Sequence, residues 1–350
     1  MTTTSAPPAR PPADERVAAV GPLRRLLVKP ELGSLIGAVV VFAFFAVQSS
    51  VFRSAGGVAN WLDPASTLGI MAVAVAMLMI GGHFDLSAGV MTGTTALTVG
   101  IVSATLGTNI WVAIAVSLLL ALGIGFLNGY LVVRTGLPSF IITLGTFLML
   151  QGLNLGLTKA FTGTVTAGGI AGTDGYASAE AVFASTITIG GQPFRIAVLW
   201  WVLVTALASW VLLRTRFGNW VFATGGDEVA SRNVGVPAAR TTITLFMTTA
   251  TAAWFVGTVT AVRLTSVQAN TGTGQELIYI VAAVIGGCLL TGGFGSAVGA
   301  SLGALVFGMT QQGIVYLRWD ADWFYFFLGA MLLLAVLTNR GVRRYAESRR

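Results

Sequence analysis

The chain has 350 residues, of which 55% are hydrophobic and only 9% are charged. A soluble domain carries roughly 25% charged residues, so this composition excludes a protein that folds in water alone. The formal net charge of +7 does not indicate nucleic-acid binding, because no segment combines a basic patch with interleaved aromatic residues. The single cysteine, Cys288, leaves no internal disulfide framework or cysteine metal site, and we expect no metal and no bound cofactor.

The two ends of the chain are polar and basic. Residues 1–31 are rich in proline and in basic residues and contain no apolar run of helical length, so we expect a disordered cytoplasmic leader. A basic region before an apolar stretch also fits a signal peptide, but the stretch at 32–47 is long and leads into further apolar segments, which argues against cleavage. Residues 341–350 are expected to form a basic cytoplasmic tail.

Between these ends the sequence predicts an all-α, polytopic membrane helix bundle, a transmembrane domain at 32–340. A bilayer core of about 30 Å needs roughly 20 apolar residues per helix. Divided on this length, the sequence contains about ten transmembrane helices, some of them broken or re-entrant. The predicted spans are 32–49, 64–80, 86–106, 110–133, 138–157, 196–213, 241–262, 276–290, 296–316 and 321–339.

The basic residues predict the orientation of these spans. Cytoplasmic loops carry an excess of Lys and Arg. With ten spans, fifteen of the twenty basic residues fall on the side of both termini, and the other five are Arg53, Lys159, Arg195, Arg263 and Arg318. Both termini are therefore expected in the cytoplasm, and the same distribution favours an even number of spans.

The segment 80–93, IGGHFDLSAGVMTG, interrupts an apolar stretch with glycines around His83 and Asp85. A carboxylate at bilayer depth costs about 2.5 kcal/mol or more, so it normally faces a cavity or a partner. The glycines permit a broken helix whose free backbone groups are satisfied by protein or water. An alternative is a turn in which Asp85 caps the third helix, and both interpretations can hold together. A lone histidine beside an aspartate also fits a proton relay, although a structural hydrogen bond is the commoner role.

The segment 285–308 begins with the same Ile-Gly-Gly sequence before a second glycine- and serine-rich turn. This similarity suggests two related halves. Internal repeats place the passage at their interface in many transporters.

Uncharged polar residues mark a hypothetical translocation path. Span five carries Thr143, Thr146, Gln151 and Asn154 at helical spacing. Amides and hydroxyls both donate and accept hydrogen bonds, which suits an uncharged, polyhydroxylated solute. Hydrogen bonding between helices explains the same residues equally well. The complete hypothetical path consists of His83, Asp85, Asn128, Thr143, Thr146, Gln151, Asn154 and Glu276.

Two connections are longer than the others. Residues 158–195 are expected outside the cell as an irregular cap that contacts an extracytoplasmic partner. Residues 214–240 are expected inside, with a short helix from Asp227 to Asn233 that Gly235 and Pro237 end. This inner loop has the character of a docking element, and an ordinary solvated loop is the alternative. The sequence contains no phosphate-binding GxxxxGK[ST] loop, so ATP, if used, is bound by another chain.

Four segments, in order along the chain, resemble the permease subunits of ABC importers for ribose, xylose and related simple sugars. They are GGHFDLSAG (81–89), LPSFIITLGT (137–146), ATGGDEVASRNVGV (223–236) and GTGQELIYIVAAVIGGCLLTGGFGS (272–296). The resemblance covers roughly residues 60–340. It differs before Asp85, where His83 and Phe84 stand in place of the family's single Ile.

The resemblance implies a non-catalytic transport subunit in a bacterial inner membrane. Its implied partners are a cytoplasmic ABC ATPase subunit, an extracytoplasmic sugar-binding protein and a second permease copy, which we expect to be identical. Asp85 occupies the family's aspartate position, and Glu276 matches a family glutamate. The implied ATPase coupling residues are Gly225, Gly226, Asp227, Glu228, Ala230, Arg232 and Gly235.

Several alternatives remain open from the sequence. The same machinery can carry a nucleoside, an autoinducer sugar or an amino acid. Asp85 is the one plausible deep charge, which favours a neutral solute over a zwitterion. A proton-coupled secondary transporter using His83 and Asp85 is a second possibility. An intramembrane hydrolase ranks last, because the single histidine has no evident serine partner.

Overall fold

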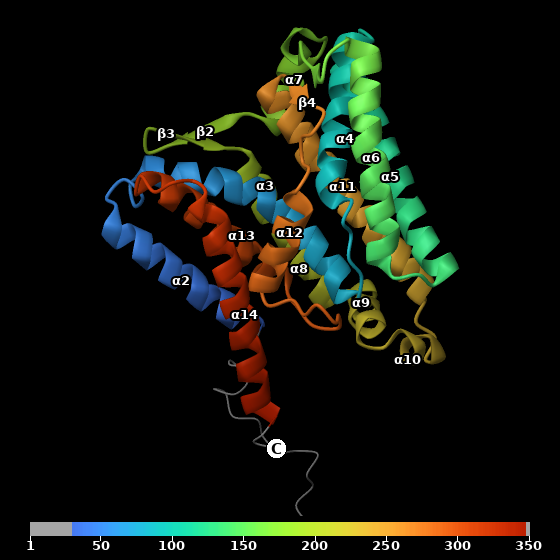
Figure 1. Cartoon of the computed structure of the whole chain (residues 1–350), viewed down its shortest axis with the longest axis vertical. Helices are drawn as coiled ribbons and strands as arrows, with labels where there is room; N and C mark the ends of the chain where they lie inside the picture. Colours follow the sequence, from blue (N-terminus) through green and yellow to red (C-terminus); the bar gives the residue numbers. More distant parts are fainter. Residues whose placement is uncertain (1–29, 348–350) are drawn as a thin grey trace, which may run out of the picture.

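The computed structural model describes residues 30–347, which form a helical bundle (Figure 1). Successive long helices alternate in direction along its long axis. The helices are α2 (Pro30–Gln48), α3 (Ala55–Ile80), α4 (Ala88–Gly100) with a π-helical turn (Ile101–Thr105), α5 (Ile110–Thr135), α6 (Ser139–Thr162), a 3-10 turn (Ile170–Gly172), α7 (Tyr176–Phe183), α8 (Ala197–Arg214), α9 (Arg216–Gly226), α10 (Glu228–Asn233), α11 (Ala238–Leu264), α12 (Gln275–Ile285), α13 (Ala297–Tyr316) and α14 (Trp323–Glu347).

The described residues contain eight helices that are long and apolar enough to cross a membrane. Two shorter apolar helices, Gln275–Ile285 and Trp323–Leu337, accompany them. Each of the ten predicted spans overlaps one of these ten helices, so the predicted fold class of a polytopic helical membrane protein is confirmed.

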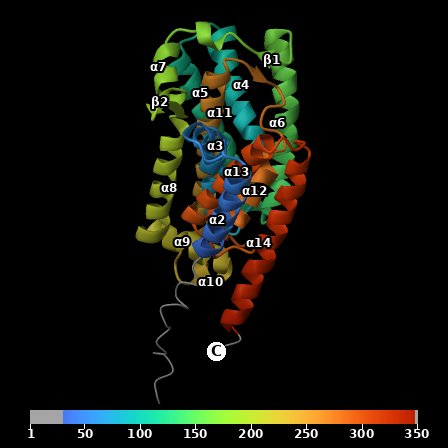
Figure 2. The same ribbon diagram turned by 90° about the vertical axis from the view of Figure 1, so that its left-hand side faces the viewer.

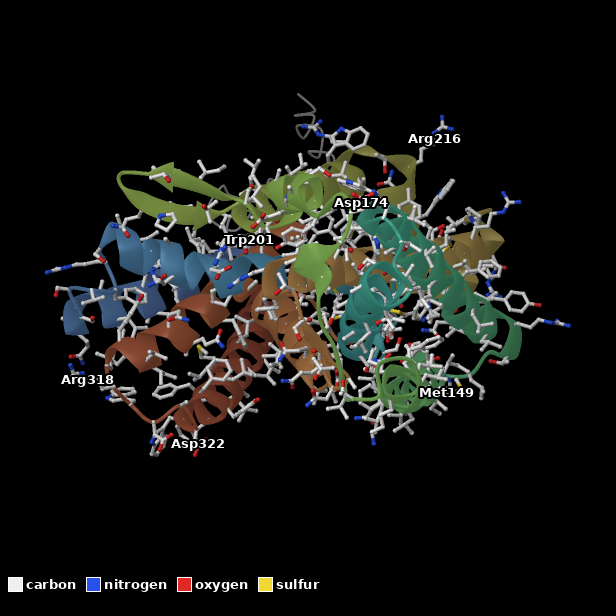
Figure 3. All side chains as sticks on the ribbon, turned by 90° about the horizontal axis from the view of Figure 1, so that it is seen from above. Met149, Asp174, Trp201, Arg216, Arg318 and Asp322 are labelled. Atoms are coloured by element: carbon white, nitrogen blue, oxygen red, sulfur yellow. The ribbon has the colours of Figure 1, made fainter. Side chains whose placement is uncertain are left out.

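Helix α3 is the centre of the bundle. Every residue from Leu68 to Ile80 is buried, and α3 packs against α8, α11, α12 and α13. The peripheral helices instead direct leucines outward, such as Leu119 of α5, which is 70% exposed. Met149 of α6 points away from the bundle in the same manner (Figure 3). These apolar faces suit contact with lipid or with another membrane chain.

The bundle has two distinct ends (Figures 1 and 2). One end, here the α10 end, carries α9 and α10 together with the start of α2 and the end of α14. The opposite end, here the α7 end, carries α7 and the hairpin of β2 (Thr186–Ile189) and β3 (Gln192–Arg195). The first and last described residues therefore lie at the same end, in agreement with an even number of crossings.

The connection at 158–195 is ordered, and the expectation of an irregular cap is wrong. It contains α7, the β2–β3 hairpin and β1 (Thr166–Ala167), which pairs antiparallel with β4 (Val267–Gln268). Its apolar residues reach the bundle, since Ala179 and Phe183 are buried. The Tyr176 hydroxyl also donates a hydrogen bond of 2.9 Å to the Val262 carbonyl.

Some predicted boundaries also need correction. Helix α2 begins at Pro30, within the predicted leader, and α14 continues to Glu347, within the predicted tail. The rest of the leader and tail, residues 1–29 and 348–350, lies outside the described residues. Helix α3 begins nine residues before the predicted position 64, since an ion pair with Arg263 neutralises the Asp63 carboxylate. The predicted span 276–290 ends at Ile285, because two glycines follow.

The Ile-Gly-Gly similarity corresponds to a local structural repeat at the ends of α3 and α12. After Ile80, the next three amides donate to carbonyls four, three and five residues back, at 3.1, 2.9 and 3.1 Å. After Ile285, the next three amides make the same pattern at 2.9, 2.9 and 3.1 Å. The second glycines, Gly82 and Gly287, have φ of 86° and 90°, a left-handed conformation that favours glycine.

Candidate functional site

Five glycines bring three segments together at the α10 end. We call this contact the glycine junction; it consists of Gly82, Gly225, Gly226, Gly292 and Gly293. The first follows α3, the next two end α9, and the last two lie in the loop after α12. The Gly293 amide donates a hydrogen bond of 2.8 Å to the Ile80 carbonyl. This bond directly joins the two repeated loops, which are the loop that follows Ile80 of α3 and the loop that follows Ile285 of α12.

The glycine junction has no room for side chains at its centre. A Cβ atom at Gly225 would lie 1.8 Å from the Ile80 carbonyl oxygen. A Cβ at Gly292 would lie 2.7 Å from the Gly225 oxygen, and one at Gly293 would lie 2.9 Å from the Gly226 Cα. The end of α9 therefore touches both repeated loops through backbone atoms.

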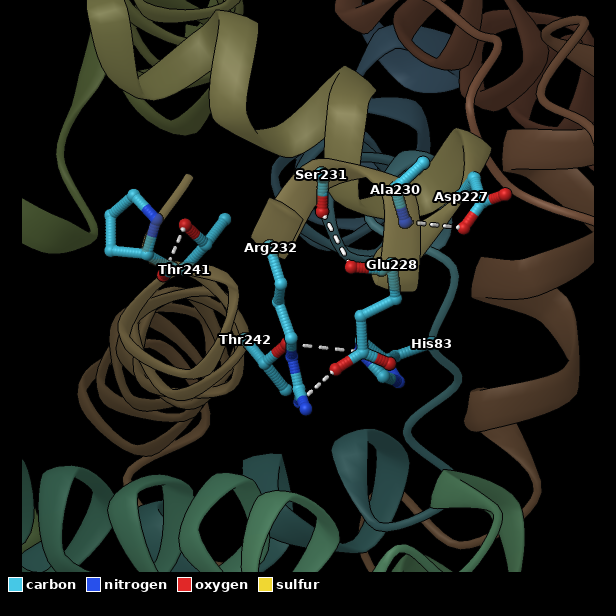
Figure 4. Close-up of polar contacts among 9 residues, drawn as sticks. His83, Asp227, Glu228, Ala230, Ser231, Arg232, Thr241 and Thr242 are labelled. Atoms are coloured by element: carbon cyan, nitrogen blue, oxygen red, sulfur yellow. Dashed lines mark hydrogen bonds and ion pairs between the residues drawn. The ribbon is translucent and has the colours of Figure 1, made fainter. Parts of the chain in front are cut away.

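Helix α10 follows the glycine junction and confirms the predicted short helix. The Asp227 carboxylate caps it by accepting a hydrogen bond of 2.9 Å from the Ala230 amide. Glu228 and Arg232 form an ion pair one turn apart (Figure 4). Gly235, with φ of 85°, turns the chain toward α11. The expected coupling residues, Gly225 to Gly235, thus form one cap-helix-turn unit that projects from the bundle (Figure 1).

His83 lies where the first repeated loop meets α11, close to α10 (Figure 4). Its Nε2 is 3.0 Å from the Thr242 hydroxyl oxygen. Burial lowers the pKa of His83, an effect that the nearby Glu228 carboxylate partly offsets. The imidazole is therefore neutral at pH 7, which suits a hydrogen bond with a hydroxyl.

Asp85 folds the loop that leads into α4. Its Oδ1 accepts hydrogen bonds from the Ser87 amide at 2.8 Å and from the Ser87 hydroxyl at 2.5 Å. This arrangement agrees with the expected role of Asp85 at the start of the third span. Within residues 30–347, no hydrogen bond or ion pair joins Asp85 to His83, so the geometry gives no support to a relay between the two.

Asn128 and the threonines of α6 hold the same loop. The Asn128 Nδ2 donates to the Ser87 hydroxyl at 3.1 Å, and the Thr146 hydroxyl donates to the Asn128 Oδ1 at 2.6 Å. The Leu86 amide donates to the Thr143 hydroxyl at 3.0 Å. These groups satisfy one another across three segments, which favours hydrogen bonding between helices over contact with a cargo.

The other two polar residues of α6 separate. Asn154 is buried, with Thr143 and Thr146, on the inner face of the helix. Its Nδ2 has no hydrogen-bond partner among the described residues. Gln151 is exposed on the outer face, so its expected place on a shared polar face is wrong. Gln151 lies three residues before the buried Asn154 but five after Thr146, so it falls at the edge of the shared face, and the packing of α6 leaves this edge exposed.

Glu276 lies in the first turn of α12, where α12 packs against the first turn of α4. Its side chain is buried, and both carboxylate oxygens accept from the Gly274 amide, at 3.1 and 3.2 Å. A Cβ at Gly89 would lie 2.1 Å from the Glu276 Oε2. The glycine at position 89 therefore permits the contact between the two helix starts.

Sequence patterns do not single out several residues that hold this region. Ser87 bridges Asp85 and Asn128, and Thr242 is the partner of His83. Ser139 accepts a hydrogen bond of 2.9 Å from the Phe84 amide. Hydroxyl residues occur throughout these helices, so the sequence does not distinguish these three from the others. The glycine pair at 292–293, by contrast, is visible in the sequence as part of a glycine-rich turn.

Comparison with known proteins assigns the chain to a family of transport subunits. The family described as "Branched-chain amino acid transport system / permease component" matches residues 57–336. The ribose import permease protein RbsC of Escherichia coli K12 is 30% identical over 316 residues, 88% of this chain and 93% of the relative. The autoinducer 2 import system permease protein LsrC of Salmonella typhi is 32% identical over 320 residues, 91% of this chain and 88% of the relative. No solved structure matches significantly. The chain therefore belongs to the permease components of the branched-chain amino acid transport system family.

Proposed function

We propose that this chain is the membrane-spanning permease subunit of an ATP-driven, binding-protein-dependent importer, and that it moves a simple sugar into the cytoplasm by alternating access. The family name refers to amino acids, but the relatives that resemble the chain along most of its length are named for ribose and autoinducer 2. Cargo therefore differs among members of the family.

The glycine junction is the observation that carries the proposal. A force applied to α10 reaches both repeated loops at once, because the end of α9 contacts each of them through backbone atoms. Interfaces that pack this closely move between discrete arrangements and do not deform gradually. The excess of basic residues toward the α10 end supports a cytoplasmic position for that end, where an ATPase subunit would bind.

The proposed partners follow from the two ends of the bundle. A cytoplasmic ABC ATPase docks on α10, and ATP with its magnesium ion binds to that subunit. A sugar-binding protein docks on the α7 end, at α7 and the β2–β3 hairpin. A second, identical permease copy completes the pathway in the bacterial inner membrane.

The test is ATP hydrolysis by this chain reconstituted in lipid with its ATPase subunit and binding protein. We expect hydrolysis to rise when the binding protein is loaded with one pentose or hexose, and that sugar to accumulate in the vesicles. Accumulation of an amino acid or nucleoside would identify another cargo for the same machinery. Uptake driven by a proton gradient, without an associated ATPase, would contradict the proposal and support the secondary transporter that uses His83 and Asp85.

A further inference from the structure

A polar cavity of about 260 Å³ lies between α3, α11, α12, α13 and α14. Its wall combines amide and hydroxyl side chains with aromatic rings. The residues that matter for its chemistry are Thr67, Gln275, Phe307, Gln311, Phe324 and Tyr325. A second cavity of about 260 Å³, between α2, α13 and α14, is lined almost entirely by apolar and glycine residues and offers no comparable chemistry.

The cavity contains polar groups that the protein leaves without partners. The Oε1 atom of Gln311 is buried and has no hydrogen-bond partner within residues 30–347. The Gln275 side chain, at the first residue of α12, also forms no hydrogen bond within the described part of the chain. The Thr67 hydroxyl makes one long bond, 3.4 Å, to the Pro64 carbonyl. Buried polar atoms are normally satisfied, so the Gln311 Oε1 is free to accept a hydrogen bond from water or a polar ligand, and the half-buried Gln275 amide lies beside it in the same lining.

Aromatic rings form the other side of the cavity. Phe307 and Phe324 pack edge to face with centroids 4.8 Å apart, and Tyr325, next to Phe324, is 70% exposed. The lining contains no Asp, Glu, Lys or Arg. An amino-acid zwitterion would therefore meet no opposite charge, whereas a sugar offers hydroxyls to the amides and an apolar ring face to the aromatic rings.

We propose that this cavity accepts a single neutral sugar ring during translocation, with Gln275 and Gln311 hydrogen bonding to its hydroxyls. The proposal rests on the proposed function, and it places the cargo on α12 and α13, away from the Asp85–Asn128–Thr146 network. The volume is far above the roughly 10–15 Å³ that one water molecule requires. The site is distinct from α6, where the sequence placed half of the hypothetical path.

Cysteine labelling tests occupancy directly. The full chain with Gln311→Cys is reconstituted in vesicles and treated with a maleimide in the presence of D-ribose, D-galactose or L-leucine. We expect at least one sugar to slow labelling severalfold and leucine to have no effect. Gln312→Cys is the matched control, because it is the next residue of α13 and does not line the cavity. Slowing by leucine alone, or equal slowing at both positions, would overturn the proposal.

Uptake by the complete importer separates failure of this site from failure of the proposed function. We expect Gln311→Leu and Gln275→Leu to lower sugar uptake strongly while ATPase association is unchanged, and Gln312→Leu to behave as the unsubstituted chain. Normal uptake by both cavity variants would overturn the site and leave the importer function intact. Absence of sugar uptake by the unsubstituted complex, together with uptake of leucine, would overturn both.

Discussion

Gly225 and Gly226 are neighbours with opposite tolerance for a side chain. A Cβ at Gly225 meets the Ile80 carbonyl at 1.8 Å, whereas a Cβ at Gly226 meets no atom within 4 Å. Because overpacking costs about 1–3 kcal/mol, we expect Gly225→Ala to lower thermal stability and to reduce the stimulation of ATP hydrolysis by the loaded binding protein. Gly226→Ala is the control and should change neither. Equal behaviour of the two variants would contradict a mechanical role for the glycine junction.

Asn128 and Gln151 provide a second matched comparison. Asn128 exchanges hydrogen bonds with Ser87 and Thr146, whereas Gln151 is exposed. Each such bond contributes about 0.5–1.5 kcal/mol, so we expect Asn128→Ala to lower the free energy of unfolding by about 1–2 kcal/mol. Gln151→Ala should leave it unchanged. Thermal unfolding in detergent measures both, and an unchanged melting temperature for Asn128→Ala would argue against the network.

The residues of the candidate site were only partly predictable. A costly carboxylate and interrupting glycines pointed correctly to the segment around Asp85, because both are unusual at bilayer depth. The convergence of Asn128, Thr143 and Thr146 on that segment depends on helix packing that periodicity does not specify. Gln151 shows the limit of the method, since an amide on the outer face of α6 reads the same in the sequence as one on the inner face.

Helix α10 has only six residues, so its cap is a large part of its stability. Asp227→Ala removes the bond to the Ala230 amide, a change that typically costs about 1 kcal/mol. We expect faster hydrogen exchange at 228–233 and weaker binding of the ATPase subunit. Asp227→Asn keeps a capping oxygen and should behave nearly as the native residue. If the two variants weaken ATPase binding equally, the carboxylate charge matters more than the cap.

The elements themselves were largely predictable because apolar length dominates the sequence of a membrane helix. The misplaced boundaries have specific causes. The Asp63 carboxylate interrupts the apolar run before position 64, and the sequence does not show that Arg263, 200 residues later, pairs with it inside the bundle. The ordered connection at 158–195 was missed because its strands are short and its support comes from α11 and β4, which are distant in sequence.

The whole molecule divides into two groups of helices at the α7 end (Figure 3). One buried apolar cluster contains residues of α2, α3 and α13, such as Phe45, Trp61 and Met309. A separate cluster contains residues of α4, α5, α7 and α11, such as Ile110, Phe183 and Val262. The remaining cluster is shared between the groups and includes Ile80 and Leu245. Separate cores at one end and a shared core elsewhere allow the groups to part at the α7 end while they stay joined at the α10 end.

An ion pair bridges the two groups at the α7 end. The Arg263 guanidinium of α11 donates hydrogen bonds of 2.7 and 2.6 Å to the two carboxylate oxygens of Asp63 on α3. Both side chains are partly buried, 31% and 19% exposed. Hydrogen bonds between charged groups contribute about 1.5–3 kcal/mol, enough to shift an equilibrium between two conformations by at least an order of magnitude.

We therefore expect Asp63→Asn to favour separation of the two groups, so that ATP hydrolysis without binding protein rises and sugar uptake per ATP falls. Asp320→Asn is the control, since among the described residues the Asp320 carboxylate at the same end bonds only to the nearby Asp322 amide. The exchanged pair, Asp63→Arg with Arg263→Asp, should recover part of the coupling if the contact between α3 and α11 is what matters. An Asp63→Asn importer with native hydrolysis and uptake would contradict this expectation, because the ion pair between α3 and α11 would then have no effect on the cycle.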